Sequence, residues 1–335
     1  MRIVFFILQF FFATTLLLSQ FSFPGTGSED VPYQLWTKDH WNELSDYSHN
    51  YFWTNGSGWP ADKKFQLAND IDVLSKYLLV YFDGHFQGNG KIMTVNMCDY
   101  SPFSSLYSGN SSTVIGGIND LTISGNIFTV DIDATSFAGI VGVIYYDGSV
   151  SNCITNVNLE CYDYGSQYGY FRNGGITVSN QGTISHCINN GSVTGVDFVA
   201  GIAAESRQGG GKIFNCINTG RITATSTEIK NRWNYTGAGG ICVNAPGRDW
   251  LKCCINLGDV EGSAYVGGIA VRAVGNFNDP KEVISDCINA GFVRGKKCVG
   301  GIISLFVNGP FLRNCINTGI VEGEEDSGNM LGKEE

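Results

Sequence analysis

Proline and charged residues are both scarce in this chain of 335 residues. Only 7 residues are proline and 16% are charged, whereas 44 are glycine and 43% are hydrophobic. Disordered low-complexity chains are rich in glycine and proline together, so this composition argues against that class. Many glycines without prolines instead indicate short strands joined by tight turns.

A dense run of lysine or arginine is also missing. The chain has 21 basic and 31 acidic residues and a formal net charge of −10. Binding to nucleic acid requires a basic surface, so this class of function is not expected. The acidic excess is spread along the chain, and part of it lies in the last segment, EEDSGNMLGKEE at 324–335, which we expect to be a flexible, solvated tail.

The sequence contains no H-E-x-x-H motif, no C-x₂-C pair, no nucleophile elbow and no phosphate-binding loop, so we expect no metal, no cofactor and no enzyme activity. The four histidines, His40, His49, His85 and His186, are scattered. His186 precedes a repeated cysteine at a position that varies among polar residues, namely Asn152, Asn215, Lys252, Asp286 and Asn314 in the other copies. That variation argues against a catalytic histidine.

Only one long apolar run is present, from Ile3 to Leu18 behind Arg2. Its length and position predict a secretory signal peptide over 1–24, cleaved between Ser19 and Gly27. No later run reaches the roughly 20 residues that span a membrane, so we expect a secreted protein or one displayed on the cell surface. Four N-x-S/T sequons fit a glycoprotein, at Asn55, Asn110, Asn190 and Asn234.

What the sequence has in abundance is repetition. NCINTG occurs at 215–220 and again at 314–319, and the Cys-Ile phrase starts at 153, 187, 216, 254, 287 and 315, in steps of 34, 29, 38, 33 and 28 residues. A second phrase, [GA]-G-I, recurs between these copies with a first residue at 138, 174, 200, 239, 267 and 300. Two phrases in step indicate repeated structural units.

Each unit contains short runs rich in Val and Ile, bounded by Gly, Asn and Asp, and none of them has a helical period. We therefore predict an all-β, right-handed parallel β-helix with three short strands per coil of about 30 residues, spanning 65–323. Stacked coils supply the hydrogen bonds and the core that one coil lacks. A cap over 31–64 is expected to include a short helix, with Thr37 as its N-cap and Trp41, Leu44 and Tyr47 on one face.

The six phrase cysteines are expected to be structural. They are Cys153, Cys187, Cys216, Cys254, Cys287 and Cys315. Stacked coils would place them about 4.8 Å apart with parallel Cβ vectors, wider than the roughly 3.8 Å between the Cβ atoms of a disulfide. We therefore predict a ladder of buried thiols.

With these phrases in view, the chain resembles the GLUG-motif repeat β-helix surface proteins, which are adhesin-like, and β-helix modules found in bacterial IgA-cleaving proteases. GIVG at 139–142 matches the motif, and GIAA, GICV, GIAV and GIIS follow at the equivalent positions without its final glycine. FQLANDID at 65–72, followed by YFDGHFQGNGKI at 81–92, is similar to the opening of such β-helices. The resemblance is to the β-helix modules only and does not extend to the protease part of those proteins.

Variation between coils points to function. Insertions after the G-G-I strand fall at one predicted corner and carry Arg207, Arg248, Trp250 and Phe277, which are candidate binding residues. We expect a non-catalytic adhesion, binding or structural surface protein, with host-cell or matrix glycans or proteins as partners. One alternative is a polysaccharide-cleaving enzyme of pectin-lyase type, using the D-I-D carboxylates Asp70 and Asp72 or Asp131 and Asp133. Another is a fragment of a larger surface protein.

Overall fold

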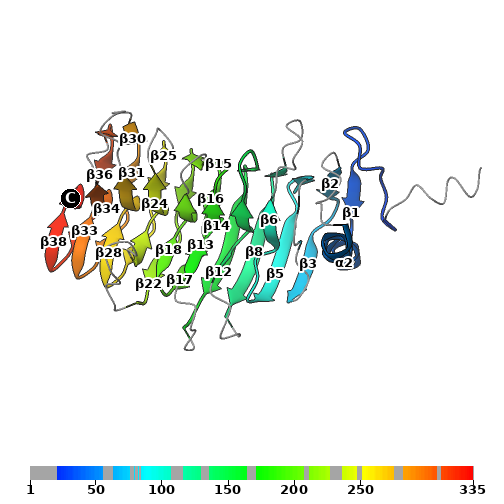
Figure 1. The fold of residues 1–335 in the computed structure, drawn as a ribbon, viewed down its shortest axis with the longest axis horizontal. Coiled ribbons are helices and arrows are strands. Elements are labelled where there is room, and N and C mark those ends of the chain that lie inside the picture. Colours follow the sequence, from blue (N-terminus) through cyan, green and yellow to red (C-terminus); the bar gives the residue numbers. More distant parts are fainter. Residues whose placement is uncertain are drawn as a thin grey trace, which may run out of the picture.

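The computed structural model describes residues 21–55, 63–75, 79, 82, 84–106, 116–129, 136–163, 171–206, 211–226, 236–246, 251–274, 282–307 and 311–334. Within these residues the chain winds into an elongated stack of coils, with the only described helix at the N-terminal end and strand β38 at the opposite end (Figure 1). Every strand pairs with a neighbour in the next coil in parallel, so the predicted all-β parallel β-helix class is confirmed.

The described strands form four parallel sheets, named A to D here, rather than three faces. Sheet A has ten strands: β1 (Tyr33–Leu35), β2 (Lys64–Leu67), β4 (His85–Gln87), β7 (Gly117–Asn119), β11 (Ser149–Ser151), β15 (Thr183–Ser185), β20 (Lys212–Phe214), β25 (Leu251–Lys252), β30 (Glu282–Ser285) and β35 (Phe311–Arg313). Sheet B has fourteen: β3 (Ile71–Ser75), β5 (Ile92–Cys98), β8 (Thr122–Phe128), β12 (Ile154–Glu160), β16 (Ile188–Asn189), β17 (Val193–Gly195), β21 (Ile217–Asn218), β22 (Ile222–Ala224), β26 (Ile255–Asn256), β27 (Val260–Glu261), β31 (Ile288–Asn289), β32 (Val293–Arg294), β36 (Ile316–Asn317) and β37 (Val321–Glu322).

Sheet C has eight strands among the described residues: β6 (Phe103–Leu106), β10 (Val141–Ile144), β14 (Thr177–Asn180), β19 (Ala203–Ser206), β24 (Cys242–Pro246), β29 (Ala270–Val274), β34 (Ile303–Val307) and β39 (Leu331–Glu334). Sheet D has seven: β9 (Ser136–Ala138), β13 (Arg172–Gly174), β18 (Phe198–Ala200), β23 (Gly237–Gly239), β28 (Ala264–Gly267), β33 (Lys297–Gly300) and β38 (Glu325–Gly328). The chain bends from sheet D to sheet C at each G-I step, which divides the single strand expected there into two.

An asparagine ladder inside the solenoid explains why the two sequence phrases repeat in step. In four of the five Cys-Ile-Asn phrases the Asn is fully buried, donates its Nδ2 to the carbonyl of the glycine two residues on, and donates again to the Asn of the next coil, as Asn218 does to Gly220 and Asn256. Asn317 in the last phrase is partly buried. The second glycine of [GA]-G-I lies against that amide, because a Cβ on Gly201 would stand 2.5 Å from Cγ of Asn218. Only glycine fits so close an approach.

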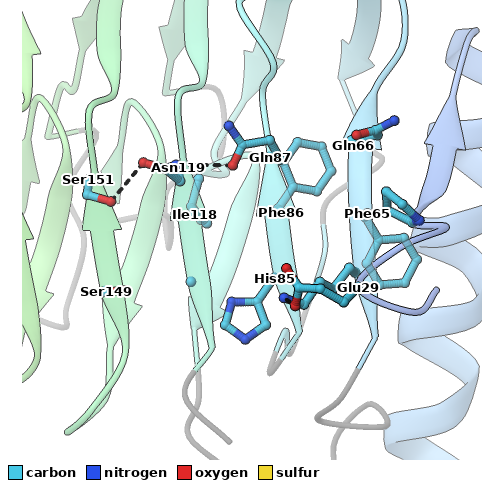
Figure 2. A pocket seen from close by; sticks show the side chains of 13 residues that line it. Glu29, Phe65, Gln66, His85, Phe86, Gln87, Ile118, Asn119, Ser149 and Ser151 are labelled. Carbon is cyan, nitrogen blue, oxygen red and sulfur yellow. Dashed lines mark hydrogen bonds and ion pairs between the residues drawn. The ribbon is translucent and has the colours of Figure 1, made fainter.

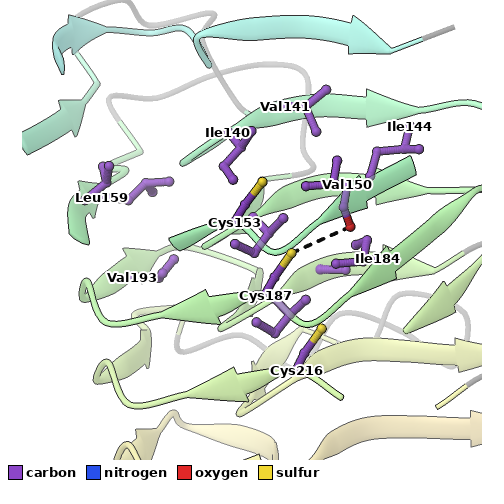
Figure 3. Close-up of a cluster of buried hydrophobic side chains, with 14 of the residues drawn as sticks. Ile140, Val141, Ile144, Val150, Cys153, Leu159, Ile184, Cys187, Val193 and Cys216 are labelled. Atoms are coloured by element: carbon purple, nitrogen blue, oxygen red, sulfur yellow. Dashed lines mark hydrogen bonds between the residues drawn. The ribbon is translucent and has the colours of Figure 1, made fainter. Parts of the chain in front are cut away.

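The cysteines form a second interior ladder beside it. The side chains of Cys153, Cys187 and Cys216 follow one another up the stack, among isoleucine and valine side chains (Figure 3). Each thiol of the six donates weakly to the carbonyl two residues before it, as Cys187 does to Ser185 at 3.3 Å. The ten cysteines whose side chains the structure describes are all free thiols.

Helix α2 (Lys38–Asn55) closes the N-terminal end of the core. It begins after Thr37, whose hydroxyl accepts a hydrogen bond from the backbone N–H of His40 at 3.4 Å, as expected for an N-cap. Trp41 and Leu44 are fully buried, and the Trp41 ring packs edge-on against Phe103 at 5.5 Å between centroids. The helix continues to Asn55, beyond Tyr47, the last residue of the predicted apolar face.

Several predicted boundaries need correction. The first strand of sheet A is β1, so the solenoid begins within the segment assigned to the cap, because Tyr33 and Leu35 pair in register with Phe65 and Leu67. The segment at 324–335 is not a flexible tail, since it contains β38 and β39. Gly328, Asn329 and Met330 occupy the positions of a further [GA]-G-I step, although their sequence differs from that phrase. Glu325 forms an ion pair with Lys297 of the preceding coil.

The predicted signal peptide over 1–24 includes residues 21–24, which the structure describes as part of the fold. Phe21 and Phe23 are only 3% and 2% exposed, and their rings stack at 4.7 Å. Phe21 also packs edge-on against Tyr33 at 5.0 Å, and the backbone carbonyl of Pro24 accepts a hydrogen bond from Gln34. Residues 21–24 therefore pack into the folded N-terminal end, and the predicted signal peptide over 1–24 remains a prediction.

Candidate binding groove

A shallow groove lies on the outer face of sheet A, near the N-terminal end of the stack. Strand alternation turns Phe65, Phe86 and Ile118 inward, where each is at most 1% exposed. The outward positions just before them form a straight row across four strands, Lys64, His85, Gly117 and Ser149. Gly117 has no side chain and Ser149 has a short one, so this row is hollow beyond His85.

The groove has a volume of about 400 Å³. Gln66, Gln87, Asn119 and Ser151 lie along one edge, and His85 lies at the other edge with Glu29 beside it in this view (Figure 2). Its rim therefore consists largely of amides and hydroxyls, and its floor is the backbone of the strands.

Hydrogen bonds between coils hold the amides in place. Asn119 donates its Nδ2 to Oε1 of Gln87 at 3.1 Å, and Gln87 donates its Nε2 to Oδ2 of Asp120 at 2.5 Å. Ser151 and Asn152 both donate to Oδ1 of Asn119 at 2.9 Å. Side chains fixed in this way lose little rotamer entropy when a ligand binds.

The charges in the groove offset one another. Lys64 forms an ion pair with Glu29, whose side chain is largely exposed. Burial, and then the positive charge of Lys64, lowers the pKa of His85 below its ordinary value, which favours the neutral imidazole. Such a site offers hydrogen bonds rather than net charge, and this chemistry suits a hydroxyl-rich ligand.

The proposed loop corner lies outside the described residues. Arg207, Arg248, Trp250 and Phe277 all fall in segments that the structure does not describe. The strands that flank these segments are placed, and each insertion joins a sheet C strand to the next sheet A strand, as between β19 and β20. The loop-corner hypothesis remains a prediction.

The other predicted residues have varied positions. Asp70 accepts a hydrogen bond from the backbone N–H of Ile92 at 2.9 Å, which is a structural role, and Asp72 lies exposed beside Thr94. Asp131 and Asp133 lie outside the described residues, as do the sequons at Asn110 and Asn234. Asn190 is exposed on sheet B, and Asn55 ends helix α2.

Five of the six phrase cysteines are fully buried, and Cys315 in the last coil is partly exposed. Burial raises the pKa of Cys187, Cys216 and Cys254.

The residue equivalent to His186 before Cys254 is Cys253 and not Lys252, because Phe214 pairs with Lys252 and Asn215 hydrogen bonds to the Lys252 carbonyl. This position is left-handed in each copy, with φ of 54° at His186 and 52° at Cys253.

Sequence reasoning missed the groove, although a signal was present. The strands KFQL, HFQ, GIN and SVS each place an outward residue, an inward apolar residue and an outward polar residue in succession. Aligning them would have shown the amide row and the gap at Gly117. No Cys-Ile phrase occurs before residue 153, so the sequence offered no marker for that alignment.

Among the described residues, no group of three or more His, Cys, Asp or Glu side chains could hold a metal ion. No helix in the described part of the chain is long and apolar enough to cross a membrane.

Comparison with known proteins shows a similarity in fold and nothing more specific. No protein-family model matches the chain, and a search of curated proteins found no significant match. Among solved structures, the chain is similar to one described as "putative immunoglobulin A1 protease from Bacteroides ovatus", with 18% sequence identity and a TM-score of 0.50. The similarity covers 87% of this chain and 79% of that one. At this level of identity the shared feature is the β-solenoid.

Proposed function

We propose that this chain is a non-catalytic adhesion or binding protein, secreted or displayed on the cell surface, that binds the end of a host-cell or matrix glycan in the groove of sheet A. The observation that carries the proposal is the row of Gln66, Gln87, Asn119 and Ser151 beside the opening at Gly117. Amides held by neighbours present donors and acceptors together, as sugar hydroxyls require.

The apolar run before residue 19 and the sequons at Asn55, Asn110 and Asn234 support an extracellular site of action. We also propose that the solenoid is of the kind formed by the GLUG-motif repeat surface proteins, supported by GIVG at 139–142 and by the glycine that contacts the asparagine ladder. The polysaccharide-cleaving alternative gains no support from Asp70, which is engaged by the backbone.

A glycan array probed with the full-length mature protein tests the proposal. Gly117→Val fills the groove from an outward strand position and leaves the core untouched, and it should abolish binding. Thr183→Val is the matched control, because Thr183 lies in the same outward row two strands further on and outside the groove. Equal glycan binding by both variants would contradict the proposal, and release of shortened glycan would favour the enzyme alternative.

A further inference from the structure

A second polar surface lies on the outer face of sheet B, in the middle of the stack. Strands β8, β12, β16, β17 and β21 stack here in register, and seven outward residues within or beside them are polar and uncharged. We call them the amide face: Ser124, Asn126, Asn156, Asn158, Asn190, Ser192 and Thr219.

The side chains of the amide face are linked from coil to coil. Asn156 donates its Nδ2 to Oγ of Ser124 at 3.2 Å, Asn190 donates to Oδ1 of Asn156 at 2.9 Å, and Thr219 donates to Oδ1 of Asn190 at 2.8 Å. In a parallel row, Ser192 donates its hydroxyl to Oδ1 of Asn158 at 3.0 Å. Every carboxamide has two N–H groups and two acceptor positions, so each asparagine in these rows keeps hydrogen-bonding capacity toward solvent.

The borders of the face define what it can accept. Arg221, at one border, is paired with Glu261 of the next coil at 2.6 Å, and Glu160, at another, accepts a hydrogen bond from the Tyr162 hydroxyl. The face itself contains only Ser, Asn and Thr side chains and is neutral on a chain of net charge −10, so charge complementarity favours a neutral ligand over an ionic one. A backbone partner is disfavoured, because a sheet face presents side chains and no free edge.

Apolar groups flank the face at two sides. Ile154, Ile188 and Ile217 form a half-buried outward row beside it. At the far end of the strands, Tyr100 and Tyr162 are 48% and 44% exposed. They occupy equivalent positions two coils apart, since Cys98 pairs with Phe128 and Phe128 with Glu160. Rows of aliphatic and aromatic groups can contact the C–H faces of sugar rings.

We propose that the amide face binds a linear neutral polysaccharide that lies along the solenoid axis. The rows are straight because the strands pair in parallel, and they repeat about every 4.8 Å, which is similar to the rise per residue of an extended glucan. Successive sugar units would then contact successive coils, each of which presents amide donors and acceptors held in place by hydrogen bonds. This site is separate from the groove and does not depend on the function proposed for it.

Calorimetric titration with cellohexaose, laminarihexaose and maltohexaose tests the inference, using full-length mature protein made without N-glycosylation so that Asn190 is bare. At least one hexasaccharide should bind, and Asn156→Ala combined with Asn158→Ala should abolish binding. Thr219→Ala should weaken it about fivefold, which corresponds to the loss of one hydrogen bond.

Thr318→Ala is the matched control for Thr219→Ala. Both hydroxyls lie 3.4 Å from the carbonyl of an interior asparagine, but Thr318 is outside the amide face, so its removal should leave affinity unchanged. Gly117→Val should also leave it unchanged. Absence of binding to all three sugars, equal loss with Thr219→Ala and Thr318→Ala, or loss with Gly117→Val would each overturn the inference.

Discussion

Asn218 donates its side-chain amide to Oδ1 of Asn256 at 2.8 Å, across two successive coils and out of contact with solvent. The same bond joins Asn189 to Asn218 and Asn256 to Asn289, and Thr155 donates into the first amide. All the donors point toward the C-terminal end. Such a row of buried amides is stable only while every member is present, because each one satisfies its neighbour.

Removing one member should therefore destabilise the solenoid. Asn218→Ala leaves Nδ2 of Asn189, Oδ1 of Asn256 and the Gly220 carbonyl without one partner each. We expect the free energy of unfolding in urea to fall by about 2–4 kcal/mol, since each buried unsatisfied group costs roughly 1–3 kcal/mol. The exposed Thr318→Ala variant should change it by less than about 0.5 kcal/mol. A small effect from both would mean that the ladder is dispensable.

The thiol ladder predicts a loss of stability at alkaline pH. Burial raises the pKa of Cys187, Cys216 and Cys254 in the folded state above the roughly 8.5 of an unfolded cysteine. The folded state then holds its protons longer, so the contribution of these thiols to the free energy of unfolding should be constant below about pH 8 and fall as the pH rises above 8.5. Urea titrations from pH 7 to 10 measure this slope, and replacing the three cysteines by alanine should reduce it. An unchanged slope would contradict the prediction.

Lys64 should control the titration of His85. The imidazole pKa is lowered first by burial and then by the charge of Lys64, its in-register neighbour. Lys64→Met should therefore raise the pKa of His85 without restoring its ordinary value, which an NMR titration of the ring protons would detect. Lys212→Met, in the same outward row but beyond the groove, should leave it unchanged. Because the folded pKa is lowered, the stability that His85 contributes is present above about pH 6.5 and declines below it.

The signal peptidase site should lie before Phe21. Phe21 and Phe23 pack into the N-terminal end, and the backbone N–H of Ser22 donates to Glu43 of helix α2 at 2.7 Å. Mass spectrometry of the secreted protein should therefore find Phe21 retained, with cleavage next to Ser19 or Gln20. A mature chain that starts after Pro24 would contradict this packing. In the intact protein, Phe21→Ala should lower the free energy of unfolding by about 3–5 kcal/mol.

The sequence predicts the repetitive part of this fold well and the remainder poorly. Cys187 and Asn189 have counterparts in the other phrases because equivalent residues of successive coils lie on top of one another. The spacing of these residues in the sequence therefore gives the boundaries of the coils directly. The bend between sheets D and C leaves no such mark, because Gly201 is selected by its contact with Asn218 and not by a change in pattern. The groove depends on Gly117 lying beside His85, a neighbour relation set by coils that carry no repeated phrase.

The identical NCINTG copies at 215–220 and 314–319 occupy the same place in their respective coils. A gene that recombined between these two stretches would delete or duplicate the 99 residues from 216 to 314. Either junction would restore the phrase unchanged, and after a deletion Asn189 would meet Asn317 in place of Asn218. Unequal crossover could thus alter the length of the protein by whole coils, while the residues before 190, including the groove of sheet A, are inherited intact.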